Sequence, residues 1–195
     1  MQQRTDNAIR NYFMKKIIGL LFFIGCFQNI FCQDVIISGV NKNRLLTWED
    51  FTGTPDENST FEANTLWKLN YSFSNMDMSG DTIRIKSFSV GVELDKNKSW
   101  IKRGKATPEL LKHEQGHFNI GLLCQHELIE QVKNTVFFTS TIKEKLQQMF
   151  TDAQYKYEAM GEQYDKETDH SKNQEAQKKW DTFFAESFAK LNIIF

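Results

Sequence analysis

The sequence has few cysteines, few prolines and no long apolar run. It contains three cysteines and two prolines in 195 residues, and only Cys124 follows the first 32 residues. One cysteine cannot form an internal disulfide, so the domain must depend on its hydrophobic core. The formal net charge is −1 and the basic residues form no run, so we expect no nucleic-acid partner. Aromatic residues make up 13% of the chain, which favours a packed domain over a disordered one.

The first 32 residues have the pattern of a secretory signal. Two lysines precede an apolar run at residues 17–27, and polar residues follow it. A basic segment before a short apolar run is typical of a signal peptide, and a membrane span needs a run of roughly 20 residues. We therefore expect Met14 to be the initiator, residues 1–32 to be the signal region, and the chain to be periplasmic or extracellular. Cys26 at the end of the run leaves open a lipid-anchored alternative.

Residues 33–195 predict one α+β domain. Residues 66–73 alternate apolar and polar side chains, as do residues 82–94, which is the pattern of half-buried strands. From Thr107 onward the apolar residues recur with helical spacing in three segments. We expect an N-terminal antiparallel sheet followed by three long helices, with residues 83–94 offering an exposed edge strand that could pair with an extended peptide.

Two of the four histidines form a motif with a glutamate. His113 and His117 are four residues apart, and Glu114 directly follows the first. On a helix this spacing places both imidazoles on one face about one turn apart, so both can bind one metal ion. Glu114 lies about 100° around the helix, where its carboxylate can contact the water that zinc activates. This spacing predicts a zinc-hydrolase site on the first long helix, and Thr107 as N-cap with Pro108 as first helical residue favours that helix.

A catalytic zinc ion needs a third protein ligand, and the residues that follow the motif provide none. A histidine six residues past His117 would mark one class of zinc protease, but Leu123 stands there. Glu127 and Glu130 lie about 15 Å or more beyond His117 on the same straight helix, so they cannot reach the ion. Glu144 is expected to cap the next helix.

The remaining candidates lie at residues 164–171, which we expect to form a loop between the second and third helices. His170 is the histidine that could fold back over the motif helix from this loop. Asp165 is an alternative ligand or a residue that orients an imidazole. Tyr164 or Tyr157 could donate a hydrogen bond to the oxyanion of a reaction intermediate.

Five stretches carry a family resemblance: LTWEDFTG at residues 46–53, ANT at 63–65, HEQGHF at 113–118, YDKETDH at 164–170 and NQEAQ at 173–177. They resemble the bacterial DUF922 family, which is described as secreted zinc-dependent proteases without an assigned substrate. The family has the double-histidine helix and a Tyr-Asp-x-x-Thr-x-His stretch, so the resemblance implies that His170 is the third zinc ligand. The family usually has glycine where this chain has Ser171.

Together these patterns predict an exported zinc metallopeptidase with a zincin-like fold. His113, His117 and His170 would bind one Zn²⁺, and Glu114 would act as general base and then as proton donor to the leaving amine. The expected partner is a peptide or protein substrate.

Two alternatives to a metallopeptidase stay open. One is a cell-wall amidase, since the same site cleaves any amide. The other is a non-catalytic envelope protein with a structural zinc ion, which a fourth ligand such as Asp165 would support.

Overall fold

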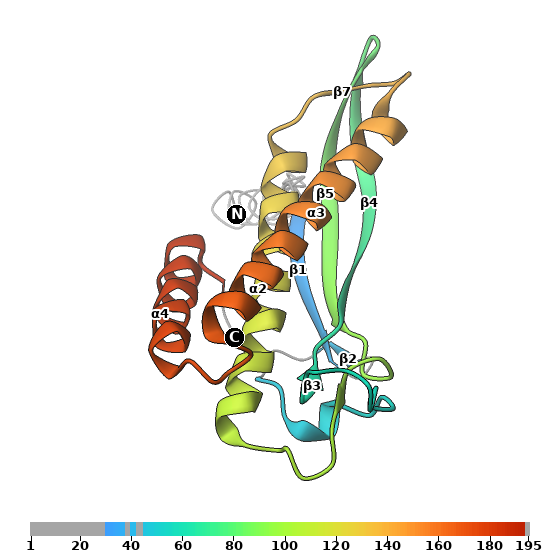
Figure 1. The fold of residues 1–195 in the computed structure, drawn as a ribbon. Helices are drawn as coiled ribbons and strands as arrows, with labels where there is room; N and C mark the ends of the chain where they lie inside the picture. The colour runs from blue at the N-terminus through green and yellow to red at the C-terminus, as the bar shows by residue number, and fades with distance from the viewer. Residues whose placement is uncertain (1–29, 38–39, 42–44, 194–195) are drawn as a thin grey trace, which may run out of the picture.

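The computed structural model describes residues 30–37, 40–41 and 45–193 of the chain, and these form an α+β domain (Figure 1). The strands are β1 (Ile30–Ile37), β2 (Val40–Asn41), β3 (Ala63–Asn64), β4 (Trp67–Ser79), β5 (Thr82–Leu94), β6 (Trp100–Ile101) and β7 (Phe137–Phe138). The helices are the 3₁₀ turn η1 (Trp48–Asp50), α2 (Pro108–Lys133), α3 (Ile142–Thr168) and α4 (Gln174–Leu191). The expected order, a sheet region followed by three long helices, is confirmed.

The main sheet is mixed, and the expectation of a wholly antiparallel sheet is wrong. Its strand order is β2-β1-β5-β4, with β7 added to β5, and β3 pairs with β6 in a separate two-stranded sheet. β1 runs parallel to β5 from the pair Ile30–Ser87 to the pair Ile37–Leu94, whereas β4 and β5 form an antiparallel hairpin. Alternation along a strand reports which face is buried and is the same for both directions, so it could not show how β1 runs.

β4 forms one edge of the main sheet, and the short strand β2 forms the other. β5 lies between β1 and β4, so residues 83–94 do not form the edge strand that we expected. Among the described strands, β4 pairs only with β5. Most of the β4 side chains are accordingly exposed, whereas most β5 side chains are buried or half-buried.

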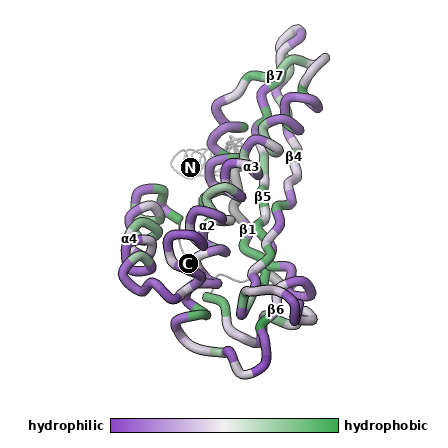
Figure 2. Tube along the Cα trace, in the orientation of Figure 1, coloured by the Kyte–Doolittle hydropathy of each residue, from purple (hydrophilic) through white to green (hydrophobic). Residues whose placement is uncertain are grey.

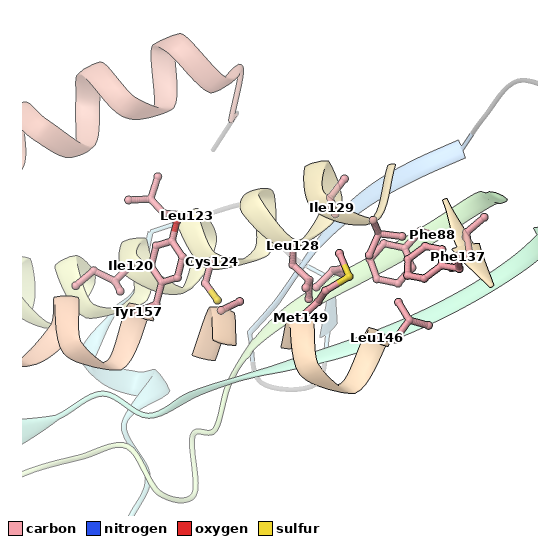
Figure 3. Close-up of a cluster of buried hydrophobic side chains, with 14 of the residues drawn as sticks. Phe88, Ile120, Leu123, Cys124, Leu128, Ile129, Phe137, Leu146, Met149 and Tyr157 are labelled. Carbon is pink, nitrogen blue, oxygen red and sulfur yellow. The ribbon is translucent and has the colours of Figure 1, made fainter. Parts of the chain in front are cut away.

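The helices cover one face of this sheet in two layers. α2 packs on β5, α3 runs antiparallel to α2 beside it, and α4 lies on the outer side of both (Figure 1). Figure 2 shows hydrophobic residues concentrated along β5, while α3 and α4 carry both hydrophobic and hydrophilic bands. Figure 3 shows the core between α2, α3 and the sheet, including Phe88, Leu128, Phe137, Met149 and Tyr157. Cys124 belongs to this core, and burial raises its thiol pKa to about 12, so it stays protonated and packs as an apolar side chain.

The ends of α2 and α3 differ in how well the sequence predicts them. α2 begins as predicted, because the Thr107 side chain accepts a hydrogen bond from the Leu110 backbone N–H at 3.1 Å and Pro108 follows the cap. At the start of α3 the N-cap residue Thr141 makes no side-chain cap hydrogen bond, so the paired cap that we expected with Glu144 is not formed. α3 continues to Thr168. Asp165 therefore lies on a helix, and the loop that we expected at residues 164–171 is confined to its last residues.

The segment that predicts export, residues 17–27 with Cys26, lies outside the described residues, so export stays a prediction. Among the helices that the structure describes, none combines the length and the apolar composition that crossing a bilayer requires.

A change at Gly121 tests how closely α2 lies on the sheet. A Cβ atom there would lie 2.8 Å from Trp67 Cδ2 and 3.0 Å from Val92 Cγ2. We expect Gly121→Ala to lower the free energy of unfolding by about 1–3 kcal/mol, although alanine favours a helix by about 1 kcal/mol. The matched control is Gly161→Ala on α3, where the nearest atom would be 3.8 Å away. Urea unfolding should show the control unchanged or stabilised; a stabilised Gly121→Ala would contradict the close packing.

Candidate metal centre

His113, Glu114 and His117 lie on the first half of α2, on the side that faces α3 and β3. His113 and Glu114 are buried, with exposed fractions of 2% and 3%, and the side chain of His117 is partly exposed. The two imidazole rings meet edge to face with centroids 4.9 Å apart. The first half of α2 therefore offers two imidazoles and a carboxylate away from bulk water.

Asp165 is where the three predicted histidine ligands meet. Its Oδ1 atom lies 3.1 Å from His113 Nε2, 2.9 Å from His117 Nε2 and 3.2 Å from His170 Nδ1. The ligand atoms of His113, Asp165 and His170 all lie within 4.8 Å of one another. Two residues from α2, one from the end of α3 and one from the loop after it thus surround a single point.

The donor set suits a zinc ion. Ligands at the zinc–nitrogen and zinc–oxygen distances of about 2.0–2.2 Å lie no more than roughly 4.4 Å from one another, and the contacts of Asp165 with the three nitrogens are shorter than this. Imidazole and carboxylate are ordinary zinc ligands, and thiolate is not required. Among the described residues, His113, Asp165 and His170 have ligand atoms close enough together to hold one ion of this kind, and His117, which also contacts Asp165, lies outside that group.

The pKa values of Asp165 and His117 are shifted by their mutual contact. Burial alone would raise the pKa of the Asp165 carboxyl, but hydrogen bonds with His113 and His117 outweigh it and hold that pKa well below its usual range. Burial alone would lower the pKa of His117, but its hydrogen bond with Asp165 and the negative charges of Glu114 and Asp165 together outweigh burial and raise that pKa. Asp165 is therefore a carboxylate at neutral pH, a state that a cation at this point also favours.

Glu114 lies next to these residues, but its carboxylate is held by a residue outside the helices. Its Oε2 atom accepts a hydrogen bond of 2.6 Å from the Thr65 hydroxyl, in the segment between β3 and β4. Desolvation by burial raises the pKa of Glu114, although the nearby histidines and Thr65 act in the opposite direction. A buried carboxylate with a raised pKa is suited to exchange protons near neutral pH.

Tyr164 packs against His113 on the buried side of the site. Its ring is fully buried and stacks on His113 with centroids 4.6 Å apart. Its hydroxyl lies 3.1 Å from the backbone oxygen of His113 and 3.0 Å from Gln177 Oε1, and it does not line the cleft described below. Tyr157 does line that cleft, but its hydroxyl donates to Glu127. Both hydroxyls thus have hydrogen-bond partners within the protein, so neither has the role of oxyanion donor that we expected for Tyr164 or Tyr157.

The loop that carries His170 has an unusual backbone. Asp169, His170 and Ser171 have φ angles of 47°, 50° and 77°, in the left-handed region that costs an L-residue roughly 1–2 kcal/mol. The ring of His170 also packs against Phe61 with centroids 4.5 Å apart. These constraints turn the chain back at the end of α3 and bring His170 to Asp165.

A cleft of about 510 Å³ opens beside the site. Trp67 and Leu69 of β4 line it from the sheet, and Tyr157 and Gly161 line it from α3. The candidate site residues that line the cleft are His113, Glu114, His117, Asp165 and His170. The site is therefore open to a ligand that lies between the free edge of the sheet and α3.

Comparison with known families agrees with the resemblance in the sequence. Residues 36–171 match the family described as bacterial protein of unknown function (DUF922). The chain belongs to this family. No curated protein and no solved structure matches this chain. The three histidines that contact Asp165 lie within the matched range, and all of α4 lies beyond it.

Sequence reasoning assigned no role to two residues that contact the site. Thr65 bonds to Glu114, and Gln177 on α4 lies 3.3 Å from His113 Nδ1. We expected both stretches, ANT and NQEAQ, to carry the family resemblance; ANT lies within the matched residues and NQEAQ lies beyond them. That resemblance was the available signal, since neither spacing nor hydrophobic pattern distinguishes these two side chains from other polar residues.

Ser171 offers a test of the strained loop. Replacement of Ser171 by glycine should raise the free energy of unfolding by about 1 kcal/mol, because glycine adopts positive φ without a steric cost. Ser171→Ala keeps the Cβ atom and should give no such gain. Thermal unfolding of both variants checks this, and equal stabilities for the two would contradict a strained backbone at this residue.

Proposed function

We propose that this chain is an exported, zinc-dependent metallopeptidase with a zincin-like arrangement of its site. The observation that carries the proposal is the convergence of three histidine nitrogens on one oxygen of Asp165, next to the buried carboxylate of Glu114 and in an open cleft. Export is supported by the basic and apolar pattern before residue 28.

The residues of the chain have distinct roles in this proposal. His113, His117 and His170 hold the zinc ion, which when bound polarises the amide carbonyl and activates a water molecule. Glu114 takes up a proton of that water molecule at its carboxylate and then gives it to the leaving nitrogen. The raised pKa of Glu114 makes its carboxylate a stronger base for the first transfer. Thr65 orients that carboxylate through Oε2.

The cleft favours an extended peptide as substrate. The outer edge of β4 has no strand partner among the described residues, and the start of β4 lines the cleft beside Glu114. An extended peptide can add to such an edge through backbone hydrogen bonds, whatever its side chains. This position brings a peptide bond, in preference to an isolated amide, between β4 and the metal site.

One observation favours a second candidate, a non-catalytic protein with a structural zinc ion. Asp165 contacts all three histidines, so it could complete a four-ligand shell that leaves no position for water. Addition of a hydroxamate to the cobalt-loaded chain separates the two candidates. A changed visible spectrum indicates an open coordination position, which catalysis requires, and an unchanged spectrum indicates a closed, structural site.

Zinc content tests the ligand set. We expect about one zinc per chain by elemental analysis, and loss of it in His113→Ala, because removal of a ligand leaves the shell incomplete. His170→Ala should lose the zinc ion or bind it more weakly. The matched control is His126→Ala, since His126 lies on the same helix about 13 Å beyond His117. Zinc retained in full without His170 would assign the third ligand to Asp165.

Glu114→Gln tests the catalytic role. This variant keeps the shape of the side chain but cannot take up the proton, so hydrolysis of casein should fall by roughly 10²- to 10⁴-fold with zinc content unchanged. Thr65→Val should give a smaller loss. Equal activity of Glu114→Gln and the native chain would refute the mechanism, and turnover of peptidoglycan fragments in place of casein would identify a cell-wall amidase.

A further inference from the structure

Gln177 connects α4 to the candidate metal centre. Its side chain is buried, as is that of His113, and its Oε1 atom lies 3.3 Å from His113 Nδ1. Gln177 lies six residues beyond the end of the family match at residue 171, on a helix whose first residue is Gln174. The other nitrogen of the same imidazole, Nε2, is the one that faces Asp165.

Asp181 determines which way the Gln177 amide points. Gln177 Nε2 donates to Asp181 Oδ1 at 2.9 Å, and Asp181 Oδ2 forms an ion pair with Lys112 at 2.5 Å. A carboxylate only accepts hydrogen bonds, so the amide nitrogen must face Asp181. The amide oxygen must then face His113.

The remaining hydrogen bonds agree with this orientation. The second hydrogen of Gln177 Nε2 reaches the Tyr164 hydroxyl at 2.7 Å, and that hydroxyl can donate to the backbone oxygen of His113 at 3.1 Å. Thr168 Oγ1 lies 3.4 Å from His113 Nδ1 and donates its hydrogen to the backbone oxygen of Tyr164 at 2.6 Å. Both oxygens near His113 Nδ1 therefore act as acceptors, so Nδ1 carries the hydrogen.

We propose that Gln177 and Asp181 form a relay that fixes the tautomer of His113, with hydrogen on Nδ1 and the lone pair of Nε2 directed at the metal. Without a metal ion Nε2 donates a hydrogen to the Asp165 carboxylate. A bound cation would take the place of that hydrogen, and because Nδ1 keeps its own, the neutral imidazole would bind the cation through the Nε2 lone pair. Gln177 and Asp181 are positioning residues and touch neither metal nor substrate. The proposal rests on the metal site proposed above, but not on its peptidase activity.

Exchanging the amide and the carboxylate groups of Gln177 and Asp181 tests the relay. Asp181→Asn lets the Gln177 amide turn over, and Gln177→Glu places two carboxylates together. Each single change should weaken zinc binding by about 10- to 100-fold, the range for partners that orient a metal-bound histidine. The double variant Gln177→Glu/Asp181→Asn again places an acceptor at His113 Nδ1 and a donor beside it, so it should recover most of the affinity. Chelator competition on the purified full chain measures all of these.

A second pair on the same protein provides the control. Gln148 donates to Asp152 four residues later on α3, as Gln177 does to Asp181, but both side chains are exposed and away from the site. Gln148→Glu and Asp152→Asn should leave zinc affinity unchanged. Long-range ¹H–¹⁵N spectra of the zinc-loaded chain should show His113 protonated at Nδ1.

Three results would overturn the relay. Zinc affinity unchanged in both single variants would reject it and leave the proposed function standing. Loss of affinity in the single variants without recovery in the double variant would assign Gln177 and Asp181 to packing alone. A native chain that binds no zinc would remove both the relay and the proposed metallopeptidase.

Discussion

The close approach of α3 to α2 at Gly116 is the contact on which the site depends. A Cβ atom at residue 116 would lie 2.2 Å from the Tyr164 hydroxyl, so no larger residue allows α3 to lie where it does. Tyr164 occupies this space, stacks on His113 and contacts the backbone oxygen of His113. Asp165 is the next residue along α3, so the same contact that seats Tyr164 places the carboxylate of Asp165 among the histidines.

The site holds several ionisable groups out of water, and each has a partner that offsets the cost of burial. Asp165 has the histidines, Glu114 has Thr65, and His113 has Gln177 on its far side. Buried charges without such partners would destabilise the fold by several kcal/mol. A cation held by the same side chains would satisfy the carboxylate further, which is why we interpret the cluster as a metal centre and not as a structural network alone.

The cleft and the candidate metal centre are formed by the same segments of the chain. The residues that hold Glu114 and those that begin β4 are adjacent in the chain, so one short segment both orients the proposed base and presents the free sheet edge. α3 forms the opposite wall, carries Asp165 in its last turn and leads into the loop that holds His170. A ligand that enters between these walls meets the candidate ligands and Glu114 at once.

Local sequence patterns determined the parts of this protein that lie within one turn of a helix or one strand. The spacing of His113, Glu114 and His117, the start of α2 at Thr107 and the order of sheet and helices are of this kind, because periodicity and capping depend on near neighbours. The tertiary structure alone decided that β1 runs parallel to β5, that β4 is the edge strand, that Asp165 lies between the histidines and that Gln177 contacts His113. Most of these contacts join residues 48 or more positions apart in the sequence, and the others depend on which strand pairs with which neighbour. Long-range packing decides both, and no local pattern records it.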